Sequence, residues 1–395
     1  MRILKILGAA VGGLVVLVFF SWLYASGRTE PRSQSPYAAS NERVEGARLH
    51  TVAIAPPQEA LTFARVKTAS GLRLLRVEKY ENAQVTGVDI TGMQRQSGVP
   101  DPIALWSESG YDSIARQDGQ RLTVPVDQLD LPFDGTATQI AMGATYPDHA
   151  TEATLKNPFV FPKLRHPERW NAAIPVAKGL LDYEIELGFV ALRTVQGDAR
   201  GEAFGLVLAS DYTDRAMLMR EIDLADTASG QGYARSKSVV PMPVGTLFVI
   251  PRDLRSFYKR LDLRLYVNGQ LRQIALPKNL SWDIDQMVKE AFKRRDVPFA
   301  FADGHARLPI PDAGIPARTI ILSGTTDGVA FRRPTGRQIF VGVIEWIASL
   351  RWSQPRLFVE RALTEARDNL SYLQPGDTVV MRADYLGFLV NPIVP

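Results

Sequence analysis

Hydrophobic residues fill one unbroken run near the start of the chain, from Ile6 to Ala25, and two basic residues, Arg2 and Lys5, precede it. At about 1.5 Å per residue, a helix of this length spans the roughly 30 Å hydrocarbon core of a bilayer. The pattern therefore predicts an N-terminal transmembrane anchor over residues 1–27. A cleaved signal peptide is the alternative, although its apolar region is usually shorter.

Basic residues lie on both sides of this run, Arg2 and Lys5 before it and Arg28, Arg32 and Arg43 after it. The short leader favours a topology with the amino terminus inside and the rest of the chain outside. The sequence thus predicts a single-pass membrane protein whose body is periplasmic or otherwise extracytoplasmic, held to the membrane by its N-terminal helix.

The rest of the chain divides into three parts by its polar and apolar pattern. Residues 28–60 lack an apolar period and are rich in Ser, Pro, Arg and Glu, which is typical of a linker. Residues 61–135 hold short alternating runs and predict a small, mostly antiparallel β-domain. Residues 136–395 hold longer strand-like runs, with Asn268-Gly269 as a hairpin turn, and few helical periods. We therefore expect an α+β, β-rich fold.

Composition and charge narrow the class of protein. Hydrophobic residues make up 46% of the 395 positions and charged residues 22%, which is typical of a globular chain and excludes a disordered one. The net charge is +4 and no long block of like charges occurs, so nucleic acid is not an expected partner. Because the chain has no cysteine, a metal site must use carboxylates or the four histidines.

Two carboxylates in the larger domain stand two residues apart on a predicted strand, Glu184 and Glu186, so both point to one face. Neighbouring acids repel each other unless a cation lies between them. A third acid, Asp211, ends another apolar run. Three oxygen ligands suit a hard cation such as Mg²⁺, Mn²⁺ or Ca²⁺. The alternative is a solvated strand face.

A histidine and a glutamate, His149 and Glu152, follow Pro147 at a spacing of three. If Pro147 begins a short helix, both side chains lie on one face, and the carboxylate can orient the imidazole and stabilise its protonated form. A surface ion pair is the alternative. Two further features, Lys237 and the turn at 323–328, are common surface features when taken alone.

The order of these motifs resembles the fumarylacetoacetate hydrolase family over roughly residues 61–395, most closely from residue 141 onward. The segments that carry the resemblance are 143–152, 158–163, the Glu184/Glu186 strand, 211–215, 236–238, 267–273, 322–325, 375–377 and 386–392. The resemblance implies a mixed β-sandwich or β-roll with a small N-terminal β-domain before a catalytic domain at 136–395. It also implies a homodimer.

The resemblance implies roles for individual residues as well. The implied metal ligands, for Mg²⁺ or alternatively Mn²⁺ or Ca²⁺, are Glu184, Glu186 and Asp211; the implied catalytic residues are His149, Glu152 and Lys237; and the implied substrate-binding residues are Tyr146, Arg215 and Thr325. In this scheme His149 and Glu152 form a dyad that activates water, and Lys237 stabilises developing negative charge.

The activity implied by the resemblance is metal-dependent hydrolysis of a C–C bond in a small diketo acid, of the acylpyruvate or fumarylacetoacetate kind. A lyase or isomerase acting on a 2-keto acid through an enolate (a decarboxylase, hydratase or tautomerase) is one alternative. A non-catalytic, membrane-tethered binding module is another, because the chain departs from the family pattern. Ala144 and Thr145 stand where the family usually has Arg-Asn, and Asp214 and Ala216 stand where it usually has Ala and Asp.

Two segments, about 289–311 and 336–373, look like insertions relative to the family. The second contains an amphipathic stretch with helical spacing. It predicts either a peripheral helix that covers the core or a subunit interface, or a helix that lies against the bilayer.

Overall fold

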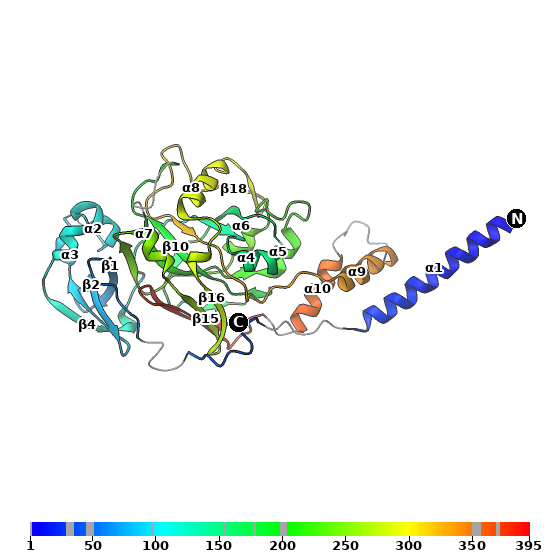
Figure 1. Ribbon diagram of the computed structural model, residues 1–395, viewed down its shortest axis with the longest axis horizontal. Helices are drawn as coiled ribbons and strands as arrows, with labels where there is room; N and C mark the ends of the chain where they lie inside the picture. Colours follow the sequence, from blue (N-terminus) through cyan, green and yellow to red (C-terminus); the bar gives the residue numbers. More distant parts are fainter. Residues whose placement is uncertain are drawn as a thin grey trace. The chain divides into compact units, whose positions relative to one another are not determined.

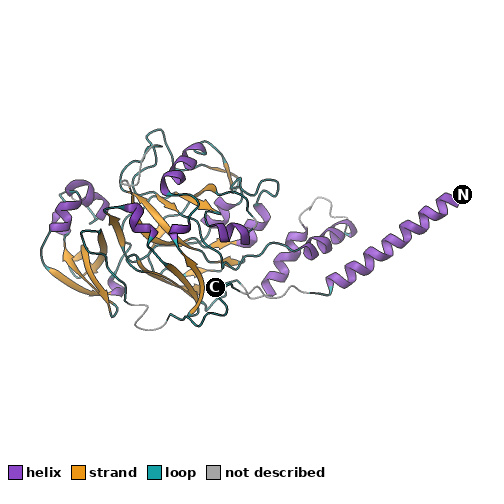
Figure 2. Ribbon diagram, in the orientation of Figure 1, coloured by secondary structure: helices purple, strands orange, loops and turns teal. Residues whose placement is uncertain are grey.

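The chain forms two compact units, one helical and one rich in strands (Figures 1 and 2). The computed structural model describes residues 2–28, 35–44, 51–95, 98–153, 155–176, 179–197, 204–349, 357–368 and 372–395. The helical unit consists of Met1–Ser33 and Phe331–Tyr372, and the other unit consists of Gln34–Ala330 and Leu373–Pro395. Each unit is built from segments that are far apart in the sequence.

A ten-stranded sheet forms the centre of the larger unit. Its order is β4 (Arg121–Pro125), β3 (Gln84–Asp89), β2 (Gly71–Glu81), β1 (Ala60–Thr68), β14 (Phe248–Pro251), β11 (Phe204–Ser210), β10 (Ile185–Ala191), β19 (Ile320–Leu322), β5 (Gln139–Gly143) and β6 (Phe159–Lys163). Strand β1 pairs antiparallel with β14, so the N-terminal strands continue this sheet. Every residue of β10 and β11 is buried, which is typical of strands covered on both faces.

A second sheet of five strands lies in the same unit. Its order is β16 (Gln270–Ala275), β15 (Leu263–Val267), β20 (Thr378–Ala383), β21 (Gly387–Val394) and β8 (Ile174–Pro175). The predicted turn between β15 and β16 is confirmed: Asn268 and Gly269 have φ of 51° and 76°, the left-handed region that a two-residue hairpin requires. Three two-stranded pairs complete the strands described: β9 (Leu181–Asp182) with β12 (Thr213–Asp214), β7 (Pro167–Glu168) with β13 (Met242–Pro243), and β17 (Phe299–Phe301) with β18 (Gly304–Ala306).

The two sheets share an aromatic core. Trp170 and Phe388 pack edge to face with ring centroids 5.5 Å apart, and Tyr80 of β2 lies 5.7 Å from Phe388 of β21. Burial of such rings stabilises a fold through area and through pair geometry. The predicted β-rich α+β fold class is therefore confirmed. The predicted division at 61–135 and 136–395 stays a prediction.

Short helices lie around the sheets of the larger unit: α2 (Pro102–Ser109), α3 (Tyr111–Arg116), α4 (Pro147–Glu152), α5 (Arg215–Glu221), α6 (Tyr233–Ser238), α7 (Leu254–Lys259) and α8 (Ile284–Lys293). Helix α8 shows why such segments become helical. Asp283 accepts a hydrogen bond from the backbone of Gln286 as its N-cap, and the buried positions Ile284, Met287 and Ala291 follow the helical period.

The helical unit holds α1 (Arg2–Ser26), α9 (Gly336–Ala348) and α10 (Leu357–Asp368). The amphipathic helix predicted within 336–373 is confirmed as α9, which begins with a capping box at Thr335 and Gln338. Arg361 of α10 donates to Glu345 of α9 at 2.9 Å, and Arg337 donates to the carbonyl oxygen of Ala25 at 3.0 Å.

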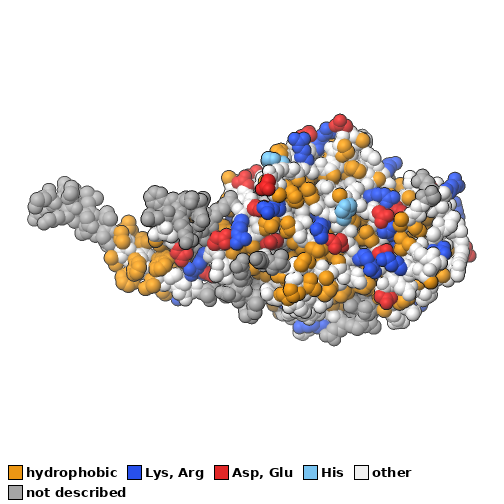
Figure 3. Space-filling model, turned by 180° about the vertical axis from the view of Figure 1, so that it is seen from behind, with side chains coloured by type: hydrophobic (Ala, Val, Ile, Leu, Met, Phe, Trp, Pro, Cys, Tyr) orange, Lys and Arg blue, Asp and Glu red, His pale blue; other side chains and the backbone are white. Residues whose placement is uncertain are grey.

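Several apolar side chains on this unit are exposed (Figure 3): Leu14, Val15, Val16, Leu17, Phe19, Phe20, Leu23, Ile339, Val343 and Ile347.

The predicted membrane anchor is not supported. Within the described residues, no helix has both the length and the apolar character needed to cross a bilayer. The prediction of a single-pass membrane location with an extracytoplasmic body is therefore contradicted.

Candidate active site

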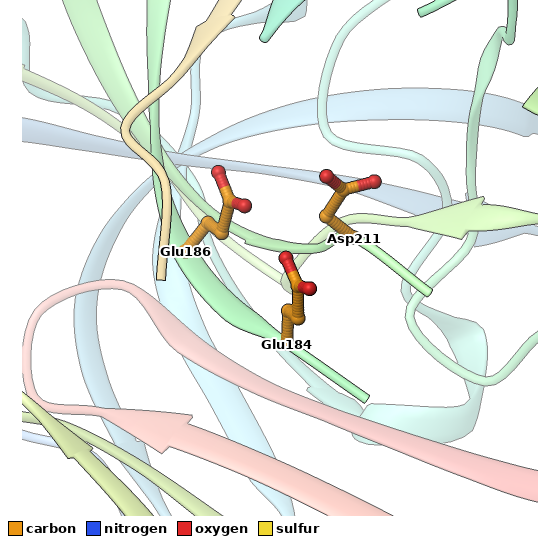
Figure 4. A group of neighbouring side chains, drawn as sticks. All are labelled: Glu184, Glu186 and Asp211. Carbon is orange, nitrogen blue, oxygen red and sulfur yellow. The ribbon is translucent and has the colours of Figure 1, made fainter. Parts of the chain in front are cut away.

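Three carboxylates from two adjacent strands meet in the interior of the larger unit (Figure 4). Glu184 immediately precedes β10, Glu186 lies within it, and Asp211 follows the last residue of β11. Because Ile185 pairs with Ser210 across these antiparallel strands, the acids are brought to the same end of the ladder. One oxygen from each carboxylate lies within 4.8 Å of the others, and all three residues are buried. The structure thus joins the three acids that the sequence singled out.

Buried cations surround these carboxylates. Lys237 Nζ lies 2.7 Å from Glu184 Oε2 and 2.6 Å from Asp211 Oδ2, and Lys163 forms an ion pair with Asp211. Arg215 pairs with Glu184, and its Nε lies 2.8 Å from Asp182 Oδ2. Charges this deep in a protein are tolerated only when they are paired.

The ion pairs between these cations and carboxylates shift the pKa values of the paired groups. Burial alone would lower the pKa of Lys237, but the carboxylates of Asp211 and Glu184 raise it above its usual value. Burial alone would raise the pKa of Asp211, whereas Lys163 and Lys237 hold it below its usual value. Lys163 shows the opposite balance, since burial lowers the pKa of its ammonium group in spite of Asp211. Lys237 therefore stays protonated and positively charged beside the acids.

Glu186 differs from the other two acids. Its Oε2 accepts a hydrogen bond from the backbone N–H of Gly324 at 2.7 Å, whereas its buried Oε1 has no hydrogen-bond partner among the described residues. Burial and the neighbouring carboxylate of Asp211 raise the pKa of Glu186 well above its usual range. A buried oxygen without a partner is costly, and a cation beside it would remove that cost. This carboxylate set therefore fits a divalent metal with oxygen ligands.

The histidine and glutamate predicted as a dyad lie on one turn of helix. Pro147 is the first residue of α4, as expected, and His149 is buried. Its Nδ1 lies 3.5 Å from Glu152 Oε2, and Glu152 Oε2 accepts a hydrogen bond from the N–H of Gly328 at 3.2 Å. The glutamate is thus held by the backbone on one side while it faces the imidazole on the other.

The dyad lies within electrostatic range of the carboxylates. Burial alone would raise the pKa of Glu184, but Lys237 and Arg215 hold it below its usual value, and His149 adds to this effect. The buried phenol oxygen of Tyr146, the N-cap residue of α4, has no hydrogen-bond partner among the described residues. Its pKa is raised by burial and then by Glu186. Tyr146 thus begins the helix of the dyad and lies within electrostatic range of Glu186.

Thr325 and Arg215, the other two residues predicted to bind substrate, are held by the protein. The hydroxyl of Thr325 donates to the carbonyl oxygen of Ile185 at 2.8 Å and accepts from Gln273 Nε2 at 3.0 Å. Arg215 is committed to Glu184 and Asp182, as described above. Both residues therefore support the strand that carries the carboxylates.

Sequence reasoning missed four members of this site: Asp182, Lys163, Gln273 and Gly324. Lys163 offered a signal in the sequence, because it directly follows the apolar run Phe159–Pro162, and the structure buries that whole strand. A lysine on an apolar strand requires a buried carboxylate. Gln273 offered no comparable signal, since its strand alternates between buried and half-buried residues like an ordinary half-exposed strand.

The departures from the family pattern are accommodated structurally. Ala144 has a φ of 57°, in the left-handed region. Thr145 is fully buried, and its hydroxyl donates to the carbonyl oxygen of Ser323. The backbone N–H of Ser281 donates to the carbonyl oxygen of Thr145 at 2.8 Å. Thr145 thus ties the end of β5 to the loop that carries Gly324.

The C-terminal part of the chain matches a known protein family. Residues 138–394 match the family described as fumarylacetoacetate (FAA) hydrolase C-terminal. The chain is 27% identical over 172 residues to a 4-hydroxyphenylacetate degradation bifunctional isomerase/decarboxylase of Salmonella dublin, covering 40% of this chain and 37% of that protein. It is 27% identical over 170 residues to a 2,4-didehydro-3-deoxy-L-rhamnonate hydrolase of a Sphingomonas species, covering 40% of this chain and 56% of that protein. The chain thus spans about half the length, or less, of these curated relatives.

A solved structure shares the fold. A fumarylacetoacetate hydrolase from Exiguobacterium antarcticum aligns with a TM-score of 0.53 and 17% identity, over 85% of this chain and 99% of that chain. At this level of identity the likeness concerns the fold alone. It confirms the predicted β-rich fold type.

Proposed function

Because the chain belongs to the fumarylacetoacetate hydrolase family, as the match over residues 138–394 shows, we propose that it is a metal-dependent enzyme acting on a small keto acid. Specifically, we propose hydrolysis of a C–C bond in a diketo acid of the acylpyruvate kind. The observation that carries this proposal is the buried carboxylate set, in which Glu186 Oε1 lacks a partner among the described residues. A cation bound beside this oxygen would supply the partner that it lacks among the described residues.

In this proposal Glu184, Glu186 and Asp211 hold the cation, as Mg²⁺ or alternatively Mn²⁺ or Ca²⁺. A bound divalent cation supplies Lewis acidity that polarises a carbonyl of the substrate. Lys237, which contacts two of the three acids, keeps its proton at neutral pH and offsets negative charge that develops on the substrate.

The dyad supplies the base. With its Nδ1 facing Glu152, the imidazole of His149 has Nε2 available to accept a proton from water. The resulting hydroxide attacks the carbonyl carbon distal to the acid group. The bond between that carbonyl carbon and the adjacent CH₂ carbon then breaks, and its electron pair stays on the CH₂ carbon as the enolate of the 2-keto acid. His149 returns the proton to this CH₂ carbon, which gives a carboxylic acid and a 2-keto acid. Glu152, fixed by the N–H of Gly328, stabilises the imidazolium between these two transfers.

Product analysis tests this function. The full chain, loaded with Mg²⁺ or Mn²⁺, is incubated with a panel of acylpyruvates and with oxaloacetate, and the products are identified by mass spectrometry. We expect release of a carboxylic acid and a 2-keto acid from at least one acylpyruvate. Absence of turnover across the panel, with metal binding demonstrated in the same sample, would contradict the enzyme proposal and favour a binding module.

A lyase or isomerase is the second candidate, because the relative from Salmonella dublin is named as an isomerase/decarboxylase. The same carboxylates and the same base can stabilise an enolate whether it forms by hydrolysis, decarboxylation or proton shift. Release of CO₂ without hydrolysis, or isomerisation without cleavage, would select this candidate over the hydrolase.

We also propose that the protein is a homodimer, as the family resemblance implies. Light scattering coupled to size-exclusion chromatography measures the mass directly. A single species of one chain mass across the accessible concentration range would contradict this proposal.

A further inference from the structure

A segment that precedes the family match packs against the edge of the five-stranded sheet. The N–H of Val44 donates to the carbonyl oxygen of Gly269 at 3.3 Å, and Arg43 forms an antiparallel bridge with Gln270 at the start of β16. Ser35, at the other end of the segment, donates to the carbonyl oxygen of Arg272 at 3.4 Å. Residues 35–44 therefore run along the β15–β16 hairpin, whereas the family match begins at residue 138.

Tyr37 projects from this segment toward the candidate active site. Its ring packs against the apolar cluster formed by Val44, Tyr266, Leu271 and Val380. Its hydroxyl lies 3.5 Å from Asp327 Oδ1, a contact between residues 290 positions apart in the sequence. Burial and then Asp327 raise the pKa of Tyr37 to about 12, so the phenol is a hydrogen-bond donor at neutral pH.

Asp327 belongs to a loop, residues 323–328, that contacts both halves of the candidate active site. At one end of the loop, the N–H of Gly324 donates to Glu186 Oε2 at 2.7 Å. At the other end, the N–H of Gly328 donates to Glu152 Oε2 at 3.2 Å. This loop therefore links the carboxylate set and the dyad through its backbone.

Other side chains hold the loop as well: Tyr183 donates to the carbonyl oxygen of Gly328 at 3.2 Å, and Gln273 donates to that of Asp327 at 3.3 Å. Gln273 of β16 donates to the hydroxyl of Thr325 and to the carbonyl oxygen of Thr326, both at 3.0 Å. Thr326 donates to Asp327 Oδ1 at 3.0 Å, within the loop itself. Tyr37 thus adds a tether to Asp327 from a different segment, next to the residue whose N–H holds Glu152.

We propose that Tyr37 is a positioning residue, which holds Asp327 and thereby fixes loop 323–328 between Glu186 and Glu152. This inference rests on the proposed function, because the spacing of the two halves matters for catalysis only if they act together. It extends the active site to a segment outside residues 138–394.

The test measures the loop directly. Hydrogen–deuterium exchange of the peptide covering 323–328 is compared between the wild-type full chain, Tyr37→Phe and Tyr111→Phe. Tyr111 is a matched control, because its hydroxyl also donates one hydrogen bond, to the carbonyl oxygen of Pro57 at 3.0 Å, away from the site. We expect exchange in this peptide to be about two- to tenfold faster in Tyr37→Phe, the range for loss of one hydrogen bond. Unchanged exchange, or the same change in Tyr111→Phe, would overturn the inference.

A double-mutant cycle separates the tether from a general loss of stability. Asp327→Ala removes the acceptor, so adding Tyr37→Phe to it should change loop exchange no further, whereas independent effects would multiply. Asp327→Asn keeps an acceptor oxygen and should exchange like the wild type. Multiplication of the two effects would show that Tyr37 does not act through Asp327.

Kinetics distinguish this inference from the proposed function. If the wild type turns over an acylpyruvate, Tyr37→Phe should lower kcat about three- to tenfold with KM within about twofold of wild type. The reason is that Asp327 adjoins Gly328, which holds Glu152, whereas Gly324, which contacts Glu186, lies at the other end of the loop. An inactive wild type would contradict the proposed function, and the exchange experiment would still decide the role of Tyr37. An active wild type with unchanged kcat in Tyr37→Phe would overturn the inference alone.

Discussion

The backbone N–H of Asp211 donates a hydrogen bond to the carbonyl oxygen of Glu184 at 3.0 Å. This bond continues the β10–β11 ladder by one step beyond its last strand pair, Ile185 with Ser210. It fixes the separation of two candidate metal ligands through the backbone. Little side-chain rearrangement is then needed to bring their carboxylates together. Backbone bonds of this kind keep a ligand set in place before the metal binds.

We predict that Glu186→Gln weakens binding of Mg²⁺ or Mn²⁺ by about tenfold, or about 1.4 kcal/mol. The substitution keeps the shape of the side chain and removes the charge that faces the other two acids. Calorimetric titration measures the change. Glu168→Gln is the control, because Glu168 pairs with Arg165 at 2.8 Å outside the carboxylate set. Equal affinities of wild type and Glu186→Gln would remove Glu186 from the site.

His149→Ala should lower kcat by about 10²- to 10⁴-fold, the range expected when a general base is lost. Glu152→Ala in the same chain should cost little more than the worse single change, because one residue orients the other. Steady-state kinetics on the best substrate of the panel measure both. His166→Ala is the control, since His166 is exposed. A double variant that loses the product of the two single effects would mean that the residues act independently.

Local sequence spacing predicted which candidate side chains share a face, and the family resemblance joined them into one site. Glu184 and Glu186 were placed together by the period of a strand, and His149 and Glu152 by one turn of a helix, because both patterns are properties of adjacent residues. The Asn268-Gly269 turn was equally local. Contacts set by tertiary packing were not accessible in this way. Nothing in the neighbourhood of Gln273 indicates that its amide reaches Thr325, 52 residues further along the chain.

The same limit explains why the first sheet was not foreseen as one structure. The short alternating runs of residues 61–135 predict strands, but the pairing of Phe63 with Phe248 depends on which edge of the larger sheet is left open. Sequence periodicity gives the face of a strand and not its partner.

Lys163→Met should destabilise the metal-free protein by about 3–5 kcal/mol, because it leaves part of the buried charge of Asp211 without its partner. Urea unfolding in the presence of a chelator measures this loss. Saturating Mg²⁺ should stabilise the variant more than the wild type, since a cation bound by Asp211 compensates the missing charge. Lys67→Met is the control, as Lys67 pairs with Asp130 at the surface, where such pairs contribute at most about 1 kcal/mol. A cost as small as that of Lys67→Met would mean that Lys237 alone balances Asp211.

Gly324→Ala should disrupt the junction between loop 323–328 and the carboxylates. Gly324 has a φ of +78°, and an added Cβ would overlap the hydroxyl of Thr145. Gly71 is the matched control, because its φ is +106° and nothing lies within 4 Å of an added Cβ there. Both variants carry the cost of a left-handed alanine, about 1–2 kcal/mol, and Gly324→Ala adds about 1–3 kcal/mol of overpacking.

Gly324→Ala should also affect the candidate metal ligands, because the N–H of Gly324 donates to Glu186. We therefore expect Gly324→Ala to lower both the free energy of unfolding and the affinity for Mg²⁺, and Gly71→Ala to lower only the first. Urea unfolding and calorimetric titration of the two variants measure these quantities. If Gly324→Ala binds Mg²⁺ like the wild type, then the N–H of Gly324 does not orient Glu186, and the loop supports the fold without setting the ligand geometry.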